Sequence, residues 1–227
     1  MSIVAIVPAR LESSRLPRKM ILAETGRPLV VETAEAVRAC GSIDRVCVAT
    51  DSAEISTACR RHNIDCVVTG PAATGTDRVA AAADLLYSAS RSPQTVLNVQ
   101  GDEPDVSAAT IESVCKAAET FPLVTARAGE GEGVAVVGSP EAAGFIRGRG
   151  RRHVGIYCFG SPRLLQKFRQ TPRTEAELAA ELEQLRVFAW GAEVQWHVVD
   201  VDHPWSGINT RADYDAFVAR RRQAGAA

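Results

Sequence analysis

IVAIVPAR (Ile3–Arg10) is followed directly by LESSRLPRK (Leu11–Lys19), and these two segments decide the fold. The first is apolar enough to form a buried strand, and the second adds Arg15, Arg18 and Lys19 to the arginine at the join, Arg10. A buried strand delivers the loop at its carboxyl end to a ligand. Because guanidinium groups pair bidentately with phosphate oxygens and an ammonium adds a mobile point charge, this loop predicts a polyphosphate ligand. A solvated basic turn is the alternative.

A second apolar stretch, Thr95–Val99, also ends in a polar segment, Gln100–Pro104, with Asp102 at its centre. Mg²⁺ prefers one or two carboxylates, with water and phosphate oxygens completing its octahedron. A triphosphate held by the first loop would supply such oxygens, so Asp102 is a predicted metal ligand. A cap for the following helix is the other interpretation.

Composition indicates one globular domain over residues 1–227: 46% of the residues are hydrophobic, 23% are charged and the net charge is −1. Without a broad basic face, nucleic-acid binding is not expected. The six cysteines show no zinc-ligand spacing and are expected to be reduced thiols. Neither a signal peptide nor an apolar run of the ~20 residues that a membrane span needs is evident, so we expect a cytoplasmic location and no membrane partner.

Strand and helix patterns alternate in the first half, which predicts a doubly wound α/β fold with a mostly parallel central sheet covered on both faces. The expected strands after the first are Arg45–Ala49, Cys66–Thr69 and Thr95–Val99, and the expected helices are Pro28–Cys40, Ala53–His62, Asp77–Ser88 and Ala108–Glu119.

The second half predicts short strands and turns, followed by helices. The expected strands are Leu123–Ala128, Gly133–Val137, His153–Phe159, Val187–Trp190 and Val194–Val199; the expected turns are Gly129–Glu132 and Arg147–Arg152; and the expected helices are Pro162–Arg169, Thr174–Leu185 and one that begins near Arg211.

Six segments, in this order, resemble the CMP-KDO synthetases, the 3-deoxy-manno-octulosonate cytidylyltransferases. They are Pro8–Lys19, Val48–Asp51, Thr74–Arg78, Asn98–Pro104, Arg152–Tyr157 and Leu182–Arg186. The resemblance covers most of the chain and identifies it as a shortened and divergent member. It implies a Rossmann-like nucleotidyltransferase domain that uses CTP and Mg²⁺, usually as a homodimer, in lipopolysaccharide biosynthesis.

For the nucleotide, the resemblance implies that cationic side chains and one carboxylate are catalytic and that the surrounding loops bind CTP. The catalytic candidates are Arg10, Arg15, Lys19 and Asp102, and the nucleotide-binding candidates are Pro8, Ala9, Arg10, Ser13, Lys19, Thr74, Gly75, Arg78 and Gln100. The Pro8 and Ala9 backbone can read a pyrimidine edge, and a glycine at position 75 lets the chain approach the ligand closely. Thr74 is alternatively no more than a helix N-cap.

For the second substrate, a KDO-like sugar acid, the resemblance implies a pocket within a sugar-binding and dimerisation region at about residues 123–190. The candidates are Gln100, Arg147, His153, Tyr157, Glu183 and Gln184. His153 and Tyr157 share one face of their strand by its period of two, as a common pocket requires.

Two departures from the family pattern concern the metal and the sugar. Where the family has Gly-x-Asp-Thr, with that Asp as second metal ligand, this chain has Gly207–Thr210, so Asn209 is the predicted partner of Asp102 at the ion. Asn209 offers a neutral carbonyl oxygen and no charge. The acids considered as substitutes for the missing carboxylate are Asp200, Asp202 and Asp213.

The second departure is a shortened segment between Leu123 and Arg152, in which the family's Val-Lys-Val lysine is absent from Val134–Val137. Either the acceptor differs from KDO, or the pocket is rebuilt by arginines. The candidate arginines are Arg149, Arg151 and Arg152.

The reaction that the sequence favours is in-line attack by an acceptor oxygen on the α-phosphorus of CTP, with pyrophosphate leaving. This chemistry requires positioning and charge neutralisation and no covalent nucleophile. The alternatives are a cytidylyltransferase for another small acid, such as a modified octulosonate, a sialic-type sugar or a phosphonate, and a catalytically silent nucleotide-binding module. A Rossmann dehydrogenase is disfavoured because no G-x-G-x-x-G follows the first strand.

Overall fold

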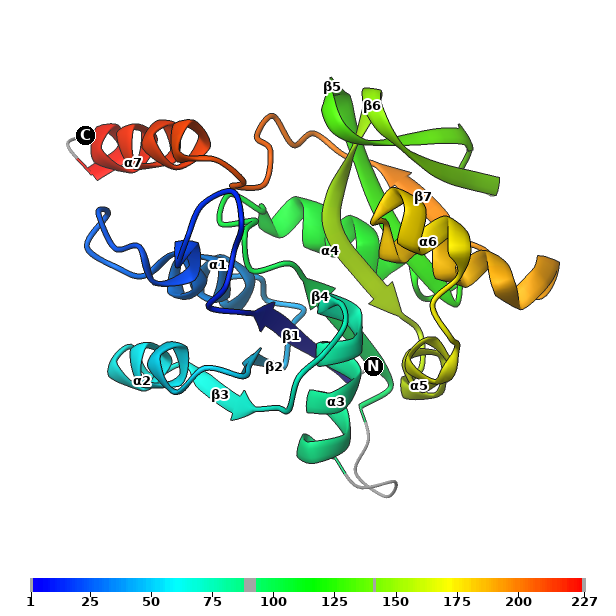
Figure 1. Cartoon of the computed structure of the whole chain (residues 1–227), viewed down its shortest axis with the longest axis horizontal. Helices are drawn as coiled ribbons and strands as arrows, with labels where there is room; N and C mark the ends of the chain where they lie inside the picture. Colours follow the sequence, from blue (N-terminus) through cyan, green and yellow to red (C-terminus); the bar gives the residue numbers. More distant parts are fainter. Residues whose placement is uncertain (1, 88–92, 141, 226–227) are drawn as a thin grey trace.

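A single β-sheet forms the centre of the molecule (Figure 1). The computed structural model describes residues 2–87, 93–140 and 142–225, and within these ranges the sheet has seven strands in the order β3-β2-β1-β4-β6-β5-β7. Strands β1 to β4 pair in parallel, β6 is antiparallel to β4 and β5, and β7 is parallel to β5. The strands are Ile3–Ala9 (β1), Arg45–Thr50 (β2), Asp65–Val68 (β3), Thr95–Val99 (β4), Leu123–Ser139 (β5), Ala142–Phe159 (β6) and His197–Asp200 (β7).

The first strand is buried along its whole length, as expected for a parallel strand covered on both faces. It lies between β2 and β4, with Ile6 opposite Cys47 on one side and Asn98 on the other. The mostly parallel α/β sheet predicted from the sequence is confirmed. Consequently the carboxyl ends of β1, β2 and β4, and the loops that follow them, lie along one edge.

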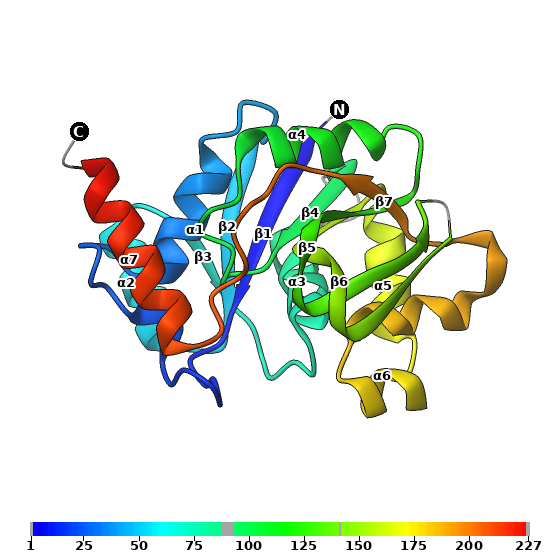
Figure 2. The ribbon, with the colours of Figure 1, turned by 90° about the horizontal axis from the view of Figure 1, so that it is seen from above.

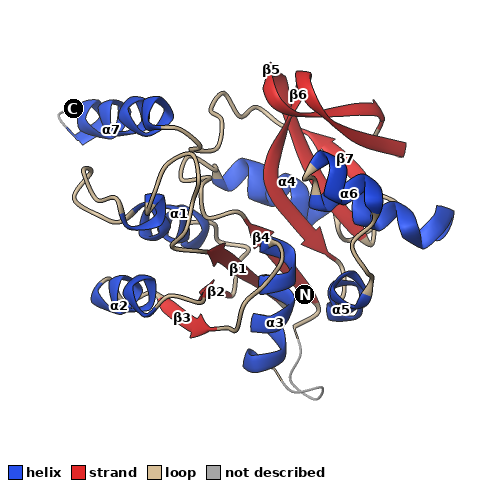
Figure 3. Ribbon diagram, in the orientation of Figure 1, coloured by secondary structure: helices blue, strands red, loops and turns tan. Residues whose placement is uncertain are grey.

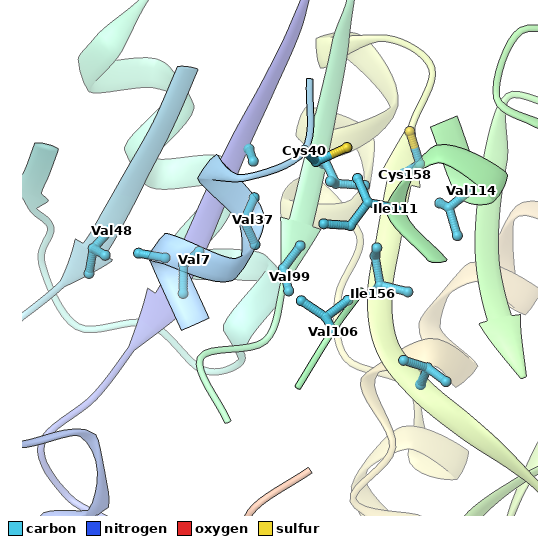
Figure 4. Packing of buried hydrophobic residues seen from close by; sticks show 14 of the residues in the cluster. Val7, Val37, Cys40, Val48, Val99, Val106, Ile111, Val114, Ile156 and Cys158 are labelled. Atoms are coloured by element: carbon cyan, nitrogen blue, oxygen red, sulfur yellow. The ribbon is translucent and has the colours of Figure 1, made fainter. Parts of the chain in front are cut away.

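Helices cover both faces of this sheet (Figures 2 and 3). On one face, Val7 belongs to a buried cluster with Val37 of α1 and Ile111 of α4 (Figure 4). On the other face, Ile6 belongs to a cluster with Val79 of α3. The helices are Leu29–Arg38 (α1), Ala53–Arg61 (α2), Gly75–Leu86 (α3), Ala108–Ala117 (α4), Pro162–Gln170 (α5), Glu175–Ala180 (α6) and Arg211–Gly225 (α7), with the 3₁₀ helices Lys19–Ile21 (η1) and Glu183–Glu193 (η2).

In the first half of the chain the predicted elements are found with ends that differ by only a few residues. Serine and threonine N-caps explain several of the helix starts, because a side-chain oxygen accepts a hydrogen bond from a backbone N–H in the first turn. Ser52 accepts from Ile55 N, and Ser107 accepts from Thr110 N. The predicted end of one helix at Ser88 lies outside the described residues.

The prediction of two short strands and a turn between residues 123 and 137 was wrong, as was the predicted turn Arg147–Arg152. Residues Leu123–Ser139 form one strand paired with Ala142–Phe159, and the far ends of β5 and β6 extend past the rest of the sheet (Figure 1). The reason lies in cross-strand pairing: Glu130 stands opposite Arg151 and Glu132 opposite Arg149. Opposite charges across strands stabilise a ladder, so the Gly-Glu and Gly-Arg repeats extend the strands instead of turning them.

The predicted strand Val187–Trp190 was also wrong, because these residues lie in the 3₁₀ helix η2. The predicted segment is a run of only four apolar residues, which is too short to separate a strand from a short helix by periodicity. The next strand, β7, is His197–Asp200. It begins three residues after the predicted strand Val194–Val199 begins and ends one residue after it.

The last helix, α7, packs beside α1 at one end of the molecule (Figure 2). Its Tyr214 and Phe217 form a small buried cluster with Leu29 of α1 and Leu16 of the basic loop. Among the described residues, no helix combines the length and the apolar character needed to cross a membrane.

A buried ion network joins the start of α3 to α6 and η2. Arg186 is 1% exposed, and its guanidinium donates to Asp77 Oδ1 at 2.6 Å and to Glu177 Oε1 at 2.6 Å. It also lies 4.2 Å from the centre of the Phe168 ring. Both carboxylates are buried, so this cation helps to offset the cost of taking them out of water; Glu177 has a second cationic partner in Arg173.

We expect Arg186→Met to lower the free energy of unfolding by about 3–5 kcal/mol, because it removes the cation that binds two buried carboxylates and leaves Glu177 with Arg173 alone. Urea unfolding measures this loss. The matched control is Arg169→Met, which removes an ion pair to Asp84 whose two side chains are 46% and 49% exposed; it should cost less than about 1 kcal/mol. Equal losses in the two variants would contradict the structural importance of the network.

Candidate active site

A cavity of about 870 Å³ opens at the carboxyl edge of β1 and β4. All the site residues predicted from the sequence line it, although they come from distant segments between Pro8 and Asn209. They are Pro8, Ala9, Arg10, Ser13, Arg15, Lys19, Thr74, Gly75, Arg78, Gln100, Asp102, Arg147, His153, Tyr157, Glu183, Gln184 and Asn209. The individual roles assigned to them remain predictions.

An ion pair lies where the two strand-end loops meet. Lys19, only 8% exposed, donates from Nζ to Asp102 Oδ2 at 2.6 Å and to the backbone oxygen of Ile208 at 2.8 Å. One ammonium therefore ties the β1 loop, the β4 loop and the segment before α7 together. The ammonium also lines the cavity, where it can bind negatively charged phosphate oxygens.

The basic loop also places Arg10 and Arg15 on the cavity wall, with both side chains exposed to it. Arg15 Nη2 donates to Asn209 Oδ1 at 2.7 Å. Arg18 does not line the cavity and pairs with Glu54 instead. The wall near β1 thus combines cations from a single loop, as a polyphosphate ligand requires.

The start of α3 forms the opposite wall. Thr74 is its N-cap, accepting a hydrogen bond from Asp77 N at 3.2 Å, so the capping interpretation is correct in geometry while the residue also lines the cavity. At Gly75 an added Cβ would lie 2.8 Å from the Gln100 side chain. A side chain at this position would displace the end of the Gln100 side chain, so glycine permits this close approach.

Arg78 is buried and braces the cavity wall. Its guanidinium donates to Asp51 Oδ2 at 2.5 Å and to Thr69 Oγ1 at 2.7 Å. The Val48–Asp51 segment is therefore held against α3 by this arginine. Because its guanidinium already binds Asp51 and Thr69, the structural role of Arg78 is to hold these loops in position.

Neutral polar groups gather at the other end of the cavity. Gln184 Nε2 donates to the Tyr157 hydroxyl at 2.8 Å, and His153 Nε2 lies 2.9 Å from Thr125 Oγ1. Burial raises the pKa of Tyr157 well above its ordinary value, so its hydroxyl keeps its hydrogen. Burial also lowers the pKa of His153 to about 3, which keeps the imidazole neutral.

Glu183 links the two ends of the cavity. Its Oε2 accepts from the backbone N of Thr76 at 3.0 Å, and its Oε1 accepts from Gln100 Nε2 at 3.4 Å. Burial raises the pKa of this carboxyl. Because Gln184 also lines the cavity, the adjacent residues Glu183 and Gln184 both reach it from η2, as a ligand lying over the helix edge requires.

The arginines near the sugar end have structural partners. Arg147 donates to the backbone oxygens of Ala180 at 2.7 Å and Glu181 at 2.9 Å, at the end of α6. Of the three arginines considered for rebuilding the pocket, only Arg152 lines it. Its guanidinium binds the backbone oxygens of residues 203 and 205. Arg149 and Arg151 lie on the paired part of β5 and β6 and do not line the cavity, so the hypothesis that they rebuild the sugar pocket was wrong.

The predicted metal ligands suit an ion that takes most of its oxygens from a substrate. Asp102 Oδ2 is bound to Lys19, and no hydrogen bond within the described ranges reaches its Oδ1. Asn209 lines the cavity with its carbonyl oxygen on Arg15. Within the described part of the chain, no group of three or more His, Cys, Asp or Glu side chains is arranged to hold a metal ion.

The acids considered as substitutes for the missing carboxylate do not line the cavity. Asp213 accepts from the backbone N of Asn209 and Thr210 and caps α7. Asp200 pairs with Arg127 and Arg151, which lower the pKa of its carboxyl.

Glu103 and Arg173 line the cavity and were not predicted. The Glu103 carboxylate accepts from Gly155 N at 3.0 Å, and an added Cβ at Gly155 or Gly207 would lie 2.9 Å from it. It lies within Asn98–Pro104, so the motif was a usable signal. Arg173 donates to Glu177 Oε1 at 3.0 Å, and only the tertiary structure brings it to the cavity.

Comparison with known proteins assigns the family. A family model described as cytidylyltransferase matches residues 4–123. A 3-deoxy-manno-octulosonate cytidylyltransferase of Anaeromyxobacter sp. (strain Fw109-5) is 34% identical over 235 residues, covering 94% of this chain and 94% of the relative. This chain belongs to that family. A second such relative, of Chlorobium phaeobacteroides (strain BS1), is 34% identical and covers 97% of this chain and 96% of its own.

Solved structures agree with this assignment. A CMP:2-keto-3-deoxy-manno-octonic acid synthetase complexed with CTP gives a TM-score of 0.85 at 25% identity, covering 99% of this chain and 100% of that chain. A cytidylyltransferase from Leptospira borgpetersenii serovar Hardjo-bovis (strain JB197) gives 0.69 at 16% identity, covering 96% and 86%, which shows the fold alone. The nucleotidyltransferase fold and the enzyme class predicted from the sequence are confirmed.

We predict that neutral His153 makes stability depend on pH. An unfolded histidine takes up a proton near pH 6.5, whereas the folded one does so only near its pKa of about 3. Between these values the unfolded state binds more protons, so stability is lost as the pH falls, by up to about 1.4 kcal/mol per pH unit. Urea unfolding between about pH 4 and about pH 7 should show a shallower slope for His153→Gln than for wild type. Identical slopes would contradict a His153 that stays neutral in the folded protein.

Proposed function

We propose that this chain transfers CMP from CTP to a KDO-like sugar acid, giving the CMP-activated sugar and pyrophosphate. One observation carries the proposal: a single cavity joins a cationic loop and the Lys19–Asp102 pair at one end to the neutral polar groups around His153 at the other. The cationic end suits a triphosphate and the neutral end suits a polyol. The family to which the chain belongs and the CTP complex of the structural neighbour support this reaction.

The residues act by positioning and by charge. The anomeric hydroxyl of the sugar acid attacks the α-phosphorus of CTP in line with the departing pyrophosphate, which leaves as the P–O bond to it breaks. Lys19 and the arginines of the basic loop meet the negative charge that grows on the leaving group, which stabilises the transition state more than bound CTP. The backbone of Pro8 and Ala9 and the start of α3 hold the cytidine.

We also propose Mg²⁺ as the cofactor, held by Asp102 and the carbonyl oxygen of Asn209 together with phosphate oxygens. When bound, the ion neutralises phosphate charge and orients the triphosphate. The free Oδ1 of Asp102 on the cavity wall supports this assignment.

Three further features belong to the proposal: a homodimer, a cytoplasmic location and a role in lipopolysaccharide biosynthesis. The exposed apolar side chains Val137 and Ile146, on the projecting arm of β5 and β6, support a surface for a second copy of the chain.

A pyrophosphate-release assay with CTP and a panel of acceptors tests the reaction. We expect release with KDO, and a kcat about 10²–10³-fold lower for Lys19→Met. The control is Lys167→Met, because Lys167 does not line the cavity and its Nζ lies over the Trp190 ring. A higher rate with another acid, such as a modified octulosonate, a sialic-type sugar or a phosphonate, would reassign the acceptor. CTP binding by calorimetry without release for any acceptor would indicate a silent nucleotide-binding module.

The Asn209→Asp variant tests the metal site. A carboxylate at this position adds a negative charge beside Asp102, so half-maximal activity should require less Mg²⁺ than in wild type. Asn209→Ala, which removes the carbonyl oxygen, should shift the requirement in the opposite direction. An unchanged Mg²⁺ dependence in both variants would show that Asn209 lies away from the ion.

A further inference from the structure

Thr125 is a fully buried residue of β5 that lies behind the sugar end of the cavity and does not line it. Its hydroxyl makes two short contacts, to the backbone oxygen of Ile156 at 2.7 Å and to His153 Nε2 at 2.9 Å. The register of β5 against β6 shifts between Thr125 and Ala126. This bulge allows the hydroxyl to reach both groups on β6.

The single hydrogen of this hydroxyl determines where the hydrogen of the His153 ring lies. A carbonyl oxygen can only accept, so the 2.7 Å contact to Ile156 requires the Thr125 hydrogen. The hydroxyl then has only lone pairs left for His153, and Nε2 must be the donor of the 2.9 Å bond.

A neutral imidazole carries one ring hydrogen, and burial keeps His153 neutral by lowering its pKa to about 3. With that hydrogen on Nε2, the other nitrogen, Nδ1, is a bare acceptor. The ring lines the cavity, and within the described part of the chain Nδ1 has no hydrogen-bond partner. Phe145 and Tyr157 hold the ring from two sides, with centroids 5.5 Å and 5.3 Å away.

We propose that Thr125 is a positioning residue for the sugar acid: it fixes the Nε2–H tautomer of His153 so that Nδ1 accepts a hydrogen bond from a sugar hydroxyl. This inference rests on the proposed function and deepens it. A carboxylate has no hydrogen to give, so Nδ1 selects a hydroxyl of the acceptor over its acid group. The acid group is therefore directed away from His153.

Ring-nitrogen NMR shifts of His153 test the positioning without turnover. We expect wild type and Thr125→Ser to show the Nε2–H tautomer, and Thr125→Val to show a mixture or the other tautomer. The matched control is Thr95→Val: Thr95 is also fully buried in the sheet, and its hydroxyl has no hydrogen-bond partner among the described residues. An Nδ1–H tautomer in wild type, or an unchanged tautomer in Thr125→Val, would overturn the proposal.

Kinetics test the consequence for the substrate. In Thr125→Val the KM for the sugar acid should rise about tenfold, which corresponds to one hydrogen bond of about 1.4 kcal/mol, while the KM for CTP stays unchanged. Thr125→Ser should restore the wild-type value, and Thr95→Val should not depart from it. An equal rise in both KM values, or none for the sugar acid, would overturn the proposal. Failure of the proposed function gives a different result, because wild type would then release no pyrophosphate with any sugar acid. That result would not depend on the His153 tautomer, and it would also remove the sugar hydroxyl as the ligand of Nδ1.

Discussion

The contact between Lys19 and Asp102 is the interaction on which the site depends. The two residues follow β1 and β4, which are separated by 85 residues of chain and lie side by side in the sheet. Their ion pair, with the additional bond to the backbone oxygen of Ile208, draws three segments to one point. Because the ammonium is nearly buried, the bond is poorly screened by water and holds the loops in register before any ligand arrives.

The sheet order explains why the cavity has two different ends. To one side of the β1–β4 contact the strands are parallel, and their loops carry arginine and lysine to the edge. To the other side β6 runs antiparallel to β4, so its residues before Ile156 extend beyond the edge and bring His153 to the cavity. The parallel side thus supplies the cations of the β1 loop, and the reversed strand supplies His153 and Tyr157 together with Arg147 and Arg152.

A second, deeper constraint joins the two halves of the molecule. The buried Arg186 binds Asp77 at the start of α3 and Glu177 in α6, two helices that the chain separates widely. Through it, the helix that carries Thr74 and Gly75 keeps a fixed relation to the residues Glu183 and Gln184 of η2. The ion network thus fixes the spacing between these two walls of the cavity, as a site that positions two substrates requires.

Local sequence patterns predicted the parallel half of the sheet and the cationic loop after β1, because strand periodicity and strand-end motifs are local properties. Most of the residues predicted to line the cavity were instead identified through the resemblance to a known family. These patterns did not predict the β5–β6 arm, since Glu130 and Arg151 stand opposite each other only once the two strands pair, and each segment by itself resembles a turn. Nor did they reveal Glu103 as a cavity residue, or the function of Thr125, whose hydroxyl matters only through the carbonyl and imidazole beside it. Those roles come from contacts between distant segments, which only the folded chain creates.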